Sequence, residues 1–210
     1  MKYVLLIIVL FAKSYILMAD GDFYASGISP EIFERMKGKS YKDDCQVDTA
    51  TLRYLHVLHY DFEGNVHEGE MVCNVSISDD LIDIFRRLYE AQYPIERMEL
   101  IDNYDADDER SMSANNTSCF NYRRQPGSRY LSKHSRGLAV DINPLYNPYV
   151  SRSRGRLHVE PSKGRNYVDR RKQFPYKIDR NDLCYKLFIE HGFSWGGGWR
   201  SVKDYQHFEK

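Results

Sequence analysis

The amino-acid sequence predicts a small single α+β domain with a central antiparallel sheet and helices packed on it. Residues 52–60 and 71–77 have β-type composition and flank a turn signal at 62–65, which favours a hairpin. A helical spacing of apolar residues follows directly after them. Strand-like and helix-like segments do not alternate regularly along the chain, which argues against a parallel α/β fold. The 210 residues suffice for one domain with a sizeable core.

The composition limits the class of partner. The chain has 30 basic and 30 acidic residues, so it lacks the overall positive charge that is typical of a nucleic-acid-binding domain. We therefore expect no nucleic acid partner. The 17 tyrosines and 10 phenylalanines suit a core with β-structure, and they would also suit a groove lined by aromatic side chains.

The first residues resemble a secretory signal peptide. A basic start is followed by an apolar run at 4–12 and then by small residues, so we predict a signal peptide over 1–19 and an exported protein. Lys13 interrupts the run, which makes it too short to span a membrane. An uncleaved anchor near the membrane is the alternative. We expect no membrane partner beyond export.

The cysteines leave the redox state open. The chain has four, none of them in a C-x-x-C pair, which disfavours a thiolate zinc finger. In an exported protein they would be able to form two disulfides, and buried free thiols are the other possibility.

The elements are predicted in chain order. Residues 20–50 read as a loosely structured lead-in with one short helix near 31–36, and the main domain covers 51–210. After the hairpin, Ser78 has the character of an N-cap, and Pro94 ends the helix that follows it. The apolar positions of that helix are Leu81, Ile84, Phe85 and Leu88.

The second half of the chain is less regular. Residues 95–102 read as a strand, 103–116 as a polar loop, 138–142 as a short apolar strand and 151–180 as a long surface excursion. A last helix is expected over 181–191. Its signals are Asp179 and Asp182 as cap residues and Gly192 directly after its end.

Two separated segments carry the residues of a candidate metal site. Residues 132–141 read SKHSRGLAVD, and residues 204–209 read DYQHFE. A catalytic zinc site commonly has three nitrogen or oxygen ligands from the protein and a fourth position for water. His134, Asp141 and His207 fit the ligand roles, and Asp204 remains as a general base.

Asp141 and His207 also have alternative interpretations. Asp141 lies in an apolar strand, where burial requires a partner; a metal is one such partner, and an N-cap or an arginine is another. His207 begins a terminal strand, and strand pairing alone would order it. We expect Phe208 to be buried, because it would anchor the strand that carries His207.

The remaining histidines have structural explanations. His56 and His59 lie in a strand-like run, where odd spacing points side chains to opposite faces, so we do not expect them to share a metal. His67 and His158 lie in polar surroundings. His191 lies at a helix C-terminus, where it complements the helix dipole.

The chain resembles the D-alanyl-D-alanine carboxypeptidase and L-alanyl-D-glutamate peptidase family of zinc metallopeptidases. The family pattern is S-x-H-x-x-x-x-x-x-D, followed far downstream by D-x-x-H, and Ser132 begins its first part. The resemblance extends over residues 50–210, including NTSCFNYR at 116–123, DINPLYNPY at 141–149 and WGGGW at 195–199.

The resemblance implies a mechanism. His134, Asp141 and His207 would bind one zinc per chain, and zinc would lower the pKa of its bound water to about 7. Asp204 would act as the general base, and Arg123 would contact the scissile carbonyl. Substrate contacts are expected from Ser132, Trp195 and Trp199, although buried packing would also explain the two tryptophans. Relatives often carry an acidic residue where this chain has Gly198.

The family fold is the Hedgehog/DD-peptidase fold, a small α+β domain whose antiparallel sheet carries the zinc site. The implied substrates are peptidoglycan stem peptides that contain D-amino acids, cleaved in the periplasm or the cell wall by a monomeric enzyme. The bond between two D-alanines and the bond between L-alanine and D-glutamate both remain candidates. A zinc-retaining binding module of the same fold, without peptidase activity, and a hydrolase of another amide are the alternatives.

Overall fold

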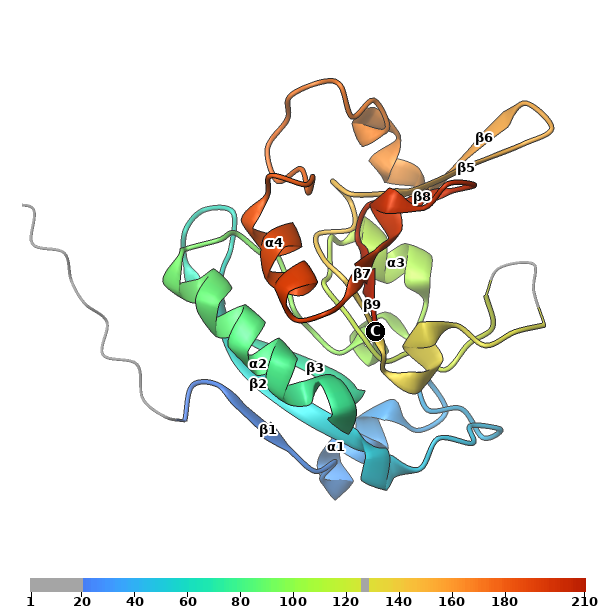
Figure 1. Cartoon of the computed structure of the whole chain (residues 1–210). Coiled ribbons are helices and arrows are strands. Elements are labelled where there is room, and N and C mark those ends of the chain that lie inside the picture. Colours follow the sequence, from blue (N-terminus) through green and yellow to red (C-terminus); the bar gives the residue numbers. More distant parts are fainter. Residues whose placement is uncertain (1–20, 126–128) are drawn as a thin grey trace, which may run out of the picture.

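The computed structural model describes residues 21–125 and 129–210 and has three small antiparallel sheets. The predicted α+β class is therefore confirmed, whereas the single central sheet is replaced by three sheets of three strands each (Figure 1). Their strand orders are β1-β2-β3, β4-β9-β7 and β6-β5-β8. The predicted signal peptide at 1–19 lies outside the described residues.

The first sheet is the long hairpin that the sequence predicts. β2 (Leu52–Tyr60) pairs antiparallel with β3 (Val66–Asn74), and β1 (Tyr24–Ser26) pairs with the other edge of β2. Helix α2 (Val75–Glu90) crosses this sheet (Figure 1). The four apolar positions predicted for this helix are all buried in the main core, which explains why the helix packs in this orientation: Leu81, Ile84, Phe85 and Leu88.

The boundary between β3 and α2 differs from the expectation. The second strand ends at Asn74 instead of residue 77, and the helix begins three residues before the predicted cap Ser78. Asn74 is the cap, because its Oδ1 accepts a hydrogen bond from the backbone N–H of Ser76 at 3.0 Å. The Ser78 hydroxyl instead donates to the carbonyl of Val75 within the first turn.

The lead-in is more ordered than expected. The predicted short helix is confirmed as α1 (Pro30–Met36), which Ser29 caps. Met36 is fully buried and contributes to a second apolar cluster with Leu52 and Phe120. This cluster attaches the lead-in, through a short 3₁₀ turn (Thr49–Thr51), to the start of β2.

The prediction of a strand over residues 95–102 is wrong. This segment makes one isolated bridge, between Arg97 and Asn116, and then enters a 3₁₀ turn, η2 (Ile101–Tyr104). Asparagine side chains satisfy its backbone: Asn143 Oδ1 accepts from the Glu96 N–H at 3.1 Å, and Asn116 Oδ1 accepts from the Glu99 N–H at 2.9 Å. Side-chain amides thus replace the ladder bonds that a strand would need.

Two regions predicted as loops contain regular structure. The polar segment 103–116 includes helix α3 (Asp108–Ser113), capped by Asp107. The excursion 151–180 includes most of a hairpin, and a 3₁₀ turn follows it, η4 (Ser162–Tyr167). The hairpin strands are β5 (Tyr149–Ser153) and β6 (Arg156–Glu160), which project from the body of the molecule (Figure 1).

The C-terminal sheet confirms two predicted strands. β4 (Ala139–Asp141) pairs antiparallel with β9 (His207–Glu209), and β7 (Ser194–Trp195) pairs with the other edge of β9. Phe208 is fully buried, as predicted, and its ring stacks on Phe188 of α4 (Leu183–Glu190) with 4.3 Å between ring centroids. This stacking anchors β9 to the core.

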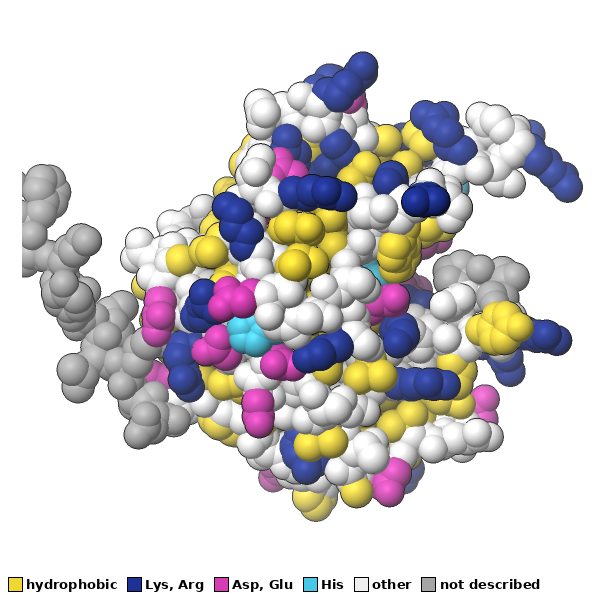
Figure 2. Space-filling model, in the orientation of Figure 1, with side chains coloured by type: hydrophobic (Ala, Val, Ile, Leu, Met, Phe, Trp, Pro, Cys, Tyr) yellow, Lys and Arg dark blue, Asp and Glu magenta, His cyan; other side chains and the backbone are white. Residues whose placement is uncertain are grey.

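Charged side chains cover the outer face of the helices. Figure 2 shows acidic and basic groups close together over this face. Arg87 of α2 forms ion pairs with Asp83 and with Glu190 of α4, and His191 at the end of α4 lies 3.1 Å from Asp83. These contacts join the two helices and give His191 the structural role that the sequence predicts.

The structure also answers the question of the disulfides, which the sequence left open. None of the four cysteines forms a disulfide; Cys45 is partly buried, and Cys73, Cys119 and Cys184 are buried. Within residues 21–125 and 129–210, no helix has the length and apolar character required to cross a membrane.

Candidate metal centre and active site

Two of the predicted ligands face each other across a pair of strands. Asp141 of β4 and His207 of β9 are directly opposite in the antiparallel register. Residues directly opposite in such a pair project from the same face of the sheet. Their side chains therefore meet, although they come from distant parts of the chain.

A tight turn supplies the third predicted ligand. His134 lies in the 3₁₀ turn η3 (Lys133–Arg136), whose cap Ser132 accepts a hydrogen bond from the His134 N–H at 3.3 Å. Gly137 ends the turn in the left-handed conformation, with φ of 65°. A Cβ at this position would lie 2.7 Å from the backbone nitrogen of Asn74, so the turn can approach β3 only because residue 137 is glycine.

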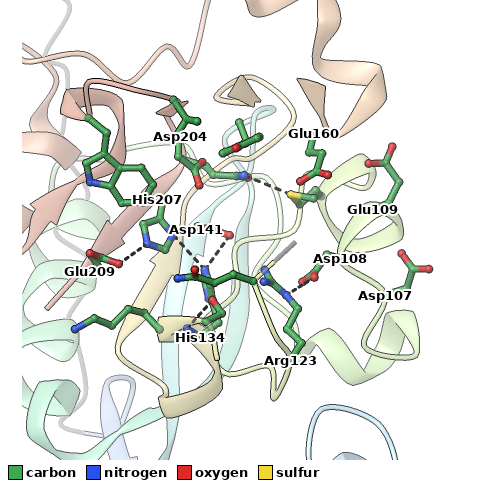
Figure 3. A pocket seen from close by; sticks show the side chains of 18 residues that line it. Asp107, Asp108, Glu109, Arg123, His134, Asp141, Glu160, Asp204, His207 and Glu209 are labelled. Atoms are coloured by element: carbon green, nitrogen blue, oxygen red, sulfur yellow. Dashed lines mark hydrogen bonds and ion pairs between the residues drawn. The ribbon is translucent and has the colours of Figure 1, made fainter. Parts of the chain in front are cut away.

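The three side chains converge on one point (Figure 3). His207 Nδ1 lies 3.0 Å from Asp141 Oδ1 and 3.2 Å from His134 Nε2, and His134 Nε2 lies 3.3 Å from Asp141 Oδ2. Among the residues that the structure describes, this is the one group of three potential metal ligands that lie this close together. The predicted residues are therefore brought together.

The spacing of this group fits zinc. With zinc–ligand bonds of about 2.0–2.1 Å, neighbouring ligand atoms in a tetrahedron lie about 3.3 Å apart. The observed separations of 3.0–3.3 Å match this value. Two imidazoles and a carboxylate, all buried, also form a donor set that zinc commonly takes.

Neutral and charged partners hold the ligands. His134 Nδ1 donates to the carbonyl of Cys119 at 2.6 Å, which leaves Nε2 as the nitrogen that faces the other two ligands. Burial opposes charge on His207, but hydrogen bonds to Asp141 and Glu209 outweigh it and raise the pKa of the His207 imidazole to about 10. For Asp141, burial opposes ionisation as well, yet the two histidines hold its pKa well below the usual range. A bound cation would replace the protons through which the two imidazoles interact with the Asp141 carboxylate.

Asp204 lies beside the ligands without being one of them. It belongs to β8 (Lys203–Asp204), opposite Tyr149 of β5, and its Oδ1 is buried without a hydrogen-bond partner. Burial raises the pKa of this carboxyl to about 7, and the attraction of His207 only partly offsets that effect. Figure 3 shows the carboxyl near His207 and at the edge of the cleft.

Gly196 explains how β8, the strand that carries Asp204, comes so close to His207. A Cβ there would lie 2.7 Å from the Asp204 carbonyl oxygen and 3.3 Å from His207 Cβ. Gly196 precedes Gly198 in the short turn η5 (Gly196–Gly198). A Cβ at Gly198 would meet no atom within 4 Å, and Gly198 does not line the cleft.

The cleft in front of the ligands has a volume of about 550 Å³. Arg123, Ser132 and Trp199, all predicted from the sequence, line it. Trp195 does not; its indole N–H donates to the Tyr205 carbonyl, and its ring contacts Phe208 in the core. Of the two tryptophans, Trp195 has the packing role and Trp199 faces the cleft.

Sequence reasoning missed several residues of the cleft. Asp108 in the first turn of α3 forms an ion pair with Arg123 Nε (Figure 3). Asn121 Nδ2 donates to Asp108 Oδ1 at 3.1 Å. Glu209 contacts His207, and the buried Gln206 lies between Asp204 and His207 in the chain and lines the cleft. The run of acidic residues at 107–109 was the available signal for α3, because an N-cap and an acidic first turn mark the start of a helix.

The excluded histidines lie apart from this group. His59 is buried and its Nδ1 donates to the Ile95 carbonyl, whereas His56 lies on the other face of β2 and is partly exposed. His67 pairs with Asp61, and His158 pairs with Glu160. Within the described residues none of these four belongs to a group of three or more potential metal ligands.

Comparison with known proteins supports the class of protein that this site suggests. Residues 126–210 match the model of a family described as D-alanyl-D-alanine carboxypeptidase. The match confirms the resemblance drawn from the motifs and spans all three potential ligands and Asp204, though not Arg123. No curated protein and no solved structure matches the chain. The match supports a peptidase.

Proposed function

We propose that this protein is a zinc-dependent peptidase that hydrolyses bonds in peptidoglycan stem peptides containing D-amino acids. The observation that supports this best is the convergence of His134, Asp141 and His207 at tetrahedral spacing, next to a buried carboxylate that is not a ligand. The match to a family described as D-alanyl-D-alanine carboxypeptidase supports this type of substrate. One zinc per chain would occupy the group.

The metal would supply a Lewis acid that lowers the pKa of water and polarises the scissile carbonyl. Asp204 accepts the proton of the attacking water and later returns it to the leaving amine. Its buried carboxyl has a pKa of about 7, which suits a group that must both take and release a proton near neutral pH.

Arg123 is placed to act on the carbonyl oxygen. Its guanidinium lines the cleft with about a quarter of the side chain exposed, and Asp108 pairs with Nε. The two terminal nitrogens therefore remain for the substrate. As negative charge develops on the oxygen, a fixed cation at this point lowers the barrier.

Three contacts hold the backbone of Arg123 in place. The Ser135 hydroxyl is fully buried and bonds to both the N–H and the carbonyl of Arg123, and the Ser132 N–H donates to the same carbonyl at 3.1 Å. One turn thus positions both Arg123 and the ligand His134. Ser132 supports the site through this turn, and with Trp199 it also offers a surface for the peptide.

A binding module that retains zinc without activity is the alternative function. Such a module needs the three ligands, but it has no use for Asp204, whose unpaired buried oxygen is energetically unfavourable. This oxygen therefore favours the enzyme. Export to the periplasm or cell wall, action as a monomer, and cleavage at either the D-alanyl-D-alanine or the L-alanyl-D-glutamate bond complete the proposal.

The test compares Asp204→Asn with Asp44→Asn, a change at an exposed aspartate of the lead-in. Purified muropeptides are digested with the zinc-loaded proteins, and mass spectrometry identifies the bond that is cut. Asp204→Asn should keep its zinc and lose at least about 100-fold in rate, the low end for general acid–base catalysis. Asp44→Asn should behave as wild type. Equal rates for wild type and Asp204→Asn would refute the role of this carboxylate, and a zinc-loaded wild type that cuts nothing would favour the binding module.

A further inference from the structure

The two ring nitrogens of His207 contact two different carboxylates. Nδ1 lies 3.0 Å from Asp141 Oδ1, and Nε2 lies 3.2 Å from Glu209 Oε2 (Figure 3). Only 7% of the side chain is exposed, so the protein and not solvent determines what each nitrogen meets. One carboxylate belongs to the potential metal site, and the other has no role in it so far.

The strand geometry explains the second contact. His207 and Glu209 are two residues apart in β9, so their side chains project from the same face. The backbone of Glu209 pairs with Ala139, and its carbonyl accepts a hydrogen bond from the Ser194 hydroxyl at 3.2 Å. The backbone of Glu209 is thus held on both sides, and its carboxylate contacts Nε2 of the imidazole.

The other histidine is arranged in the opposite way. His134 uses Nδ1 to donate to the Cys119 carbonyl and turns Nε2 toward the site. His207 turns Nδ1 toward the site and Nε2 toward Glu209. The two imidazoles therefore present different nitrogens, each because a fixed acceptor occupies the remaining one.

We propose that Glu209 is a positioning residue that holds the proton of His207 on Nε2 and so makes Nδ1 the nitrogen that binds the metal. A neutral imidazole carries one N–H, and a carboxylate beside one nitrogen draws that proton there and leaves the lone pair on the other. Acceptors of this kind fix the tautomer and orientation of metal-bound histidines. The inference rests on the proposed metal site.

Zinc affinity provides the first test, measured by competition with a chelator at fixed pH. Glu209→Ala removes the acceptor and should weaken zinc binding by about 10–100-fold, the usual effect of losing such a partner. Glu209→Gln keeps an amide oxygen that can accept from Nε2–H and should recover most of the affinity. Lys210→Ala is the matched control at the next residue, since Lys210 pairs with Asp80 and not with His207. It should bind zinc as wild type does.

Nitrogen-15 NMR of the zinc-loaded protein provides the second test, because it identifies the imidazole nitrogen that binds the metal, which a general loosening of the strand would not change. In wild type and Glu209→Gln, we expect zinc on Nδ1 of His207 and on Nε2 of His134, with a slowly exchanging proton on Nε2 of His207. In Glu209→Ala that proton should exchange rapidly.

Two results would overturn the proposal alone. One is full zinc affinity in Glu209→Ala, and the other is zinc bound through Nε2 of His207 in wild type. A wild type that binds no zinc would refute the proposed function as well, whereas the expected results in a protein without peptidase activity would refute the function and leave the role of Glu209 in place.

Discussion

The hairpin with its helix, residues 52–90, and the segment that carries the site, residues 116–210, are built on different principles. The first has two nine-residue strands and a sixteen-residue helix that bury apolar side chains. The second has strands of two to five residues and buries many polar groups. Short strands present few ladder bonds, so this segment needs other means of holding its backbone.

Asparagine side chains supply much of what the short strands lack. Asn143 and Asn147 are fully buried. Asn143 Nδ2 donates to the Pro94 carbonyl, while Asn147 Nδ2 donates to the carbonyls of Asn143 and Tyr176. The comparison teaches that a rigid site does not require long elements, provided that side chains satisfy the backbone groups that short strands leave unpaired.

The largest expected effect distinguishes two buried histidines, one from each region. His59 and His134 are each 4% exposed, and each donates from Nδ1 to a carbonyl, at 2.7 and 2.6 Å. His134→Ala should lose most of the zinc because one of three ligands is gone. His59→Ala should lower the free energy of unfolding by about 1–3 kcal/mol, because it leaves the Ile95 carbonyl unpaired, and it should keep the zinc.

Elemental analysis of the purified proteins measures this difference. Wild type and His59→Ala should contain about one zinc per chain. His207→Ala should resemble His134→Ala. Full zinc content in both ligand variants would show that the metal, if present, is held elsewhere.

A second comparison uses two buried phenylalanines. Phe85 of α2 and Phe208 of β9 are 2% and 0% exposed. Each change to alanine should lower the free energy of unfolding of the zinc-free protein by about 3–5 kcal/mol, from lost burial and a new cavity. Only Phe208→Ala should also weaken zinc binding, because Phe208 anchors the strand that carries His207.

Urea denaturation and chelator competition give the two quantities. If either alanine variant does not fold, the pair Phe85→Leu and Phe208→Leu is used in place of the alanine pair. Phe208→Leu is again expected to be the one that weakens zinc binding. An equal loss of zinc affinity at Phe85 would mean that the core transmits strain to the site without regard to position.

The smallest effect concerns the ionisation of Asp182, far from the ligands in the chain. Burial raises the pKa of this carboxyl to about 6, although Tyr93 donates a hydrogen bond to it. An unfolded aspartate has a pKa of about 3.9. Between pH about 4 and about 6, the folded state therefore binds the proton more tightly than the unfolded state does. The stability contributed by the neutral form is present below pH about 4 and is lost as the pH rises to about 6.

Asp182→Asn should remove this dependence, because the amide keeps the oxygen that caps Cys184 and never ionises. The variant should match wild type near pH 4 and exceed it by about 1 kcal/mol at pH 7, after allowance for solvent screening. Urea denaturation of the zinc-free proteins across this range measures the effect. A difference that does not change with pH would contradict the explanation.

The sequence predicted the regular region better than the site region. The apolar stripe from Leu81 to Leu88 follows from local spacing, and the strand at Ala139–Asp141 follows from its apolar run. The hairpin β5–β6 was missed because its turn, Arg154 and Gly155, has positive φ at both positions without the usual asparagine.

Within the site, the residues of the motifs were found and their supports were not. His134, Asp141 and His207 occur in recognisable spacings, and the structure brings them together. The pairing of Asp108 with Arg123 depends on how α3 packs, which local spacing does not encode. The spacing of Glu209 from His207 was visible, but a carboxylate two residues from a histidine is too common to interpret without the fold.

The antiparallel pairing of β4 with β9 has a consequence for how the protein folds. His207 meets Asp141 across 66 residues of chain and His134 across 73. Contacts of such high sequence separation require the closure of long loops, which delays them relative to local structure. A zinc ion would therefore find the three proposed ligands assembled only in the completed native state. By binding that state it would stabilise it by mass action, so metal supply would affect how long a folded molecule lasts more than how fast it forms.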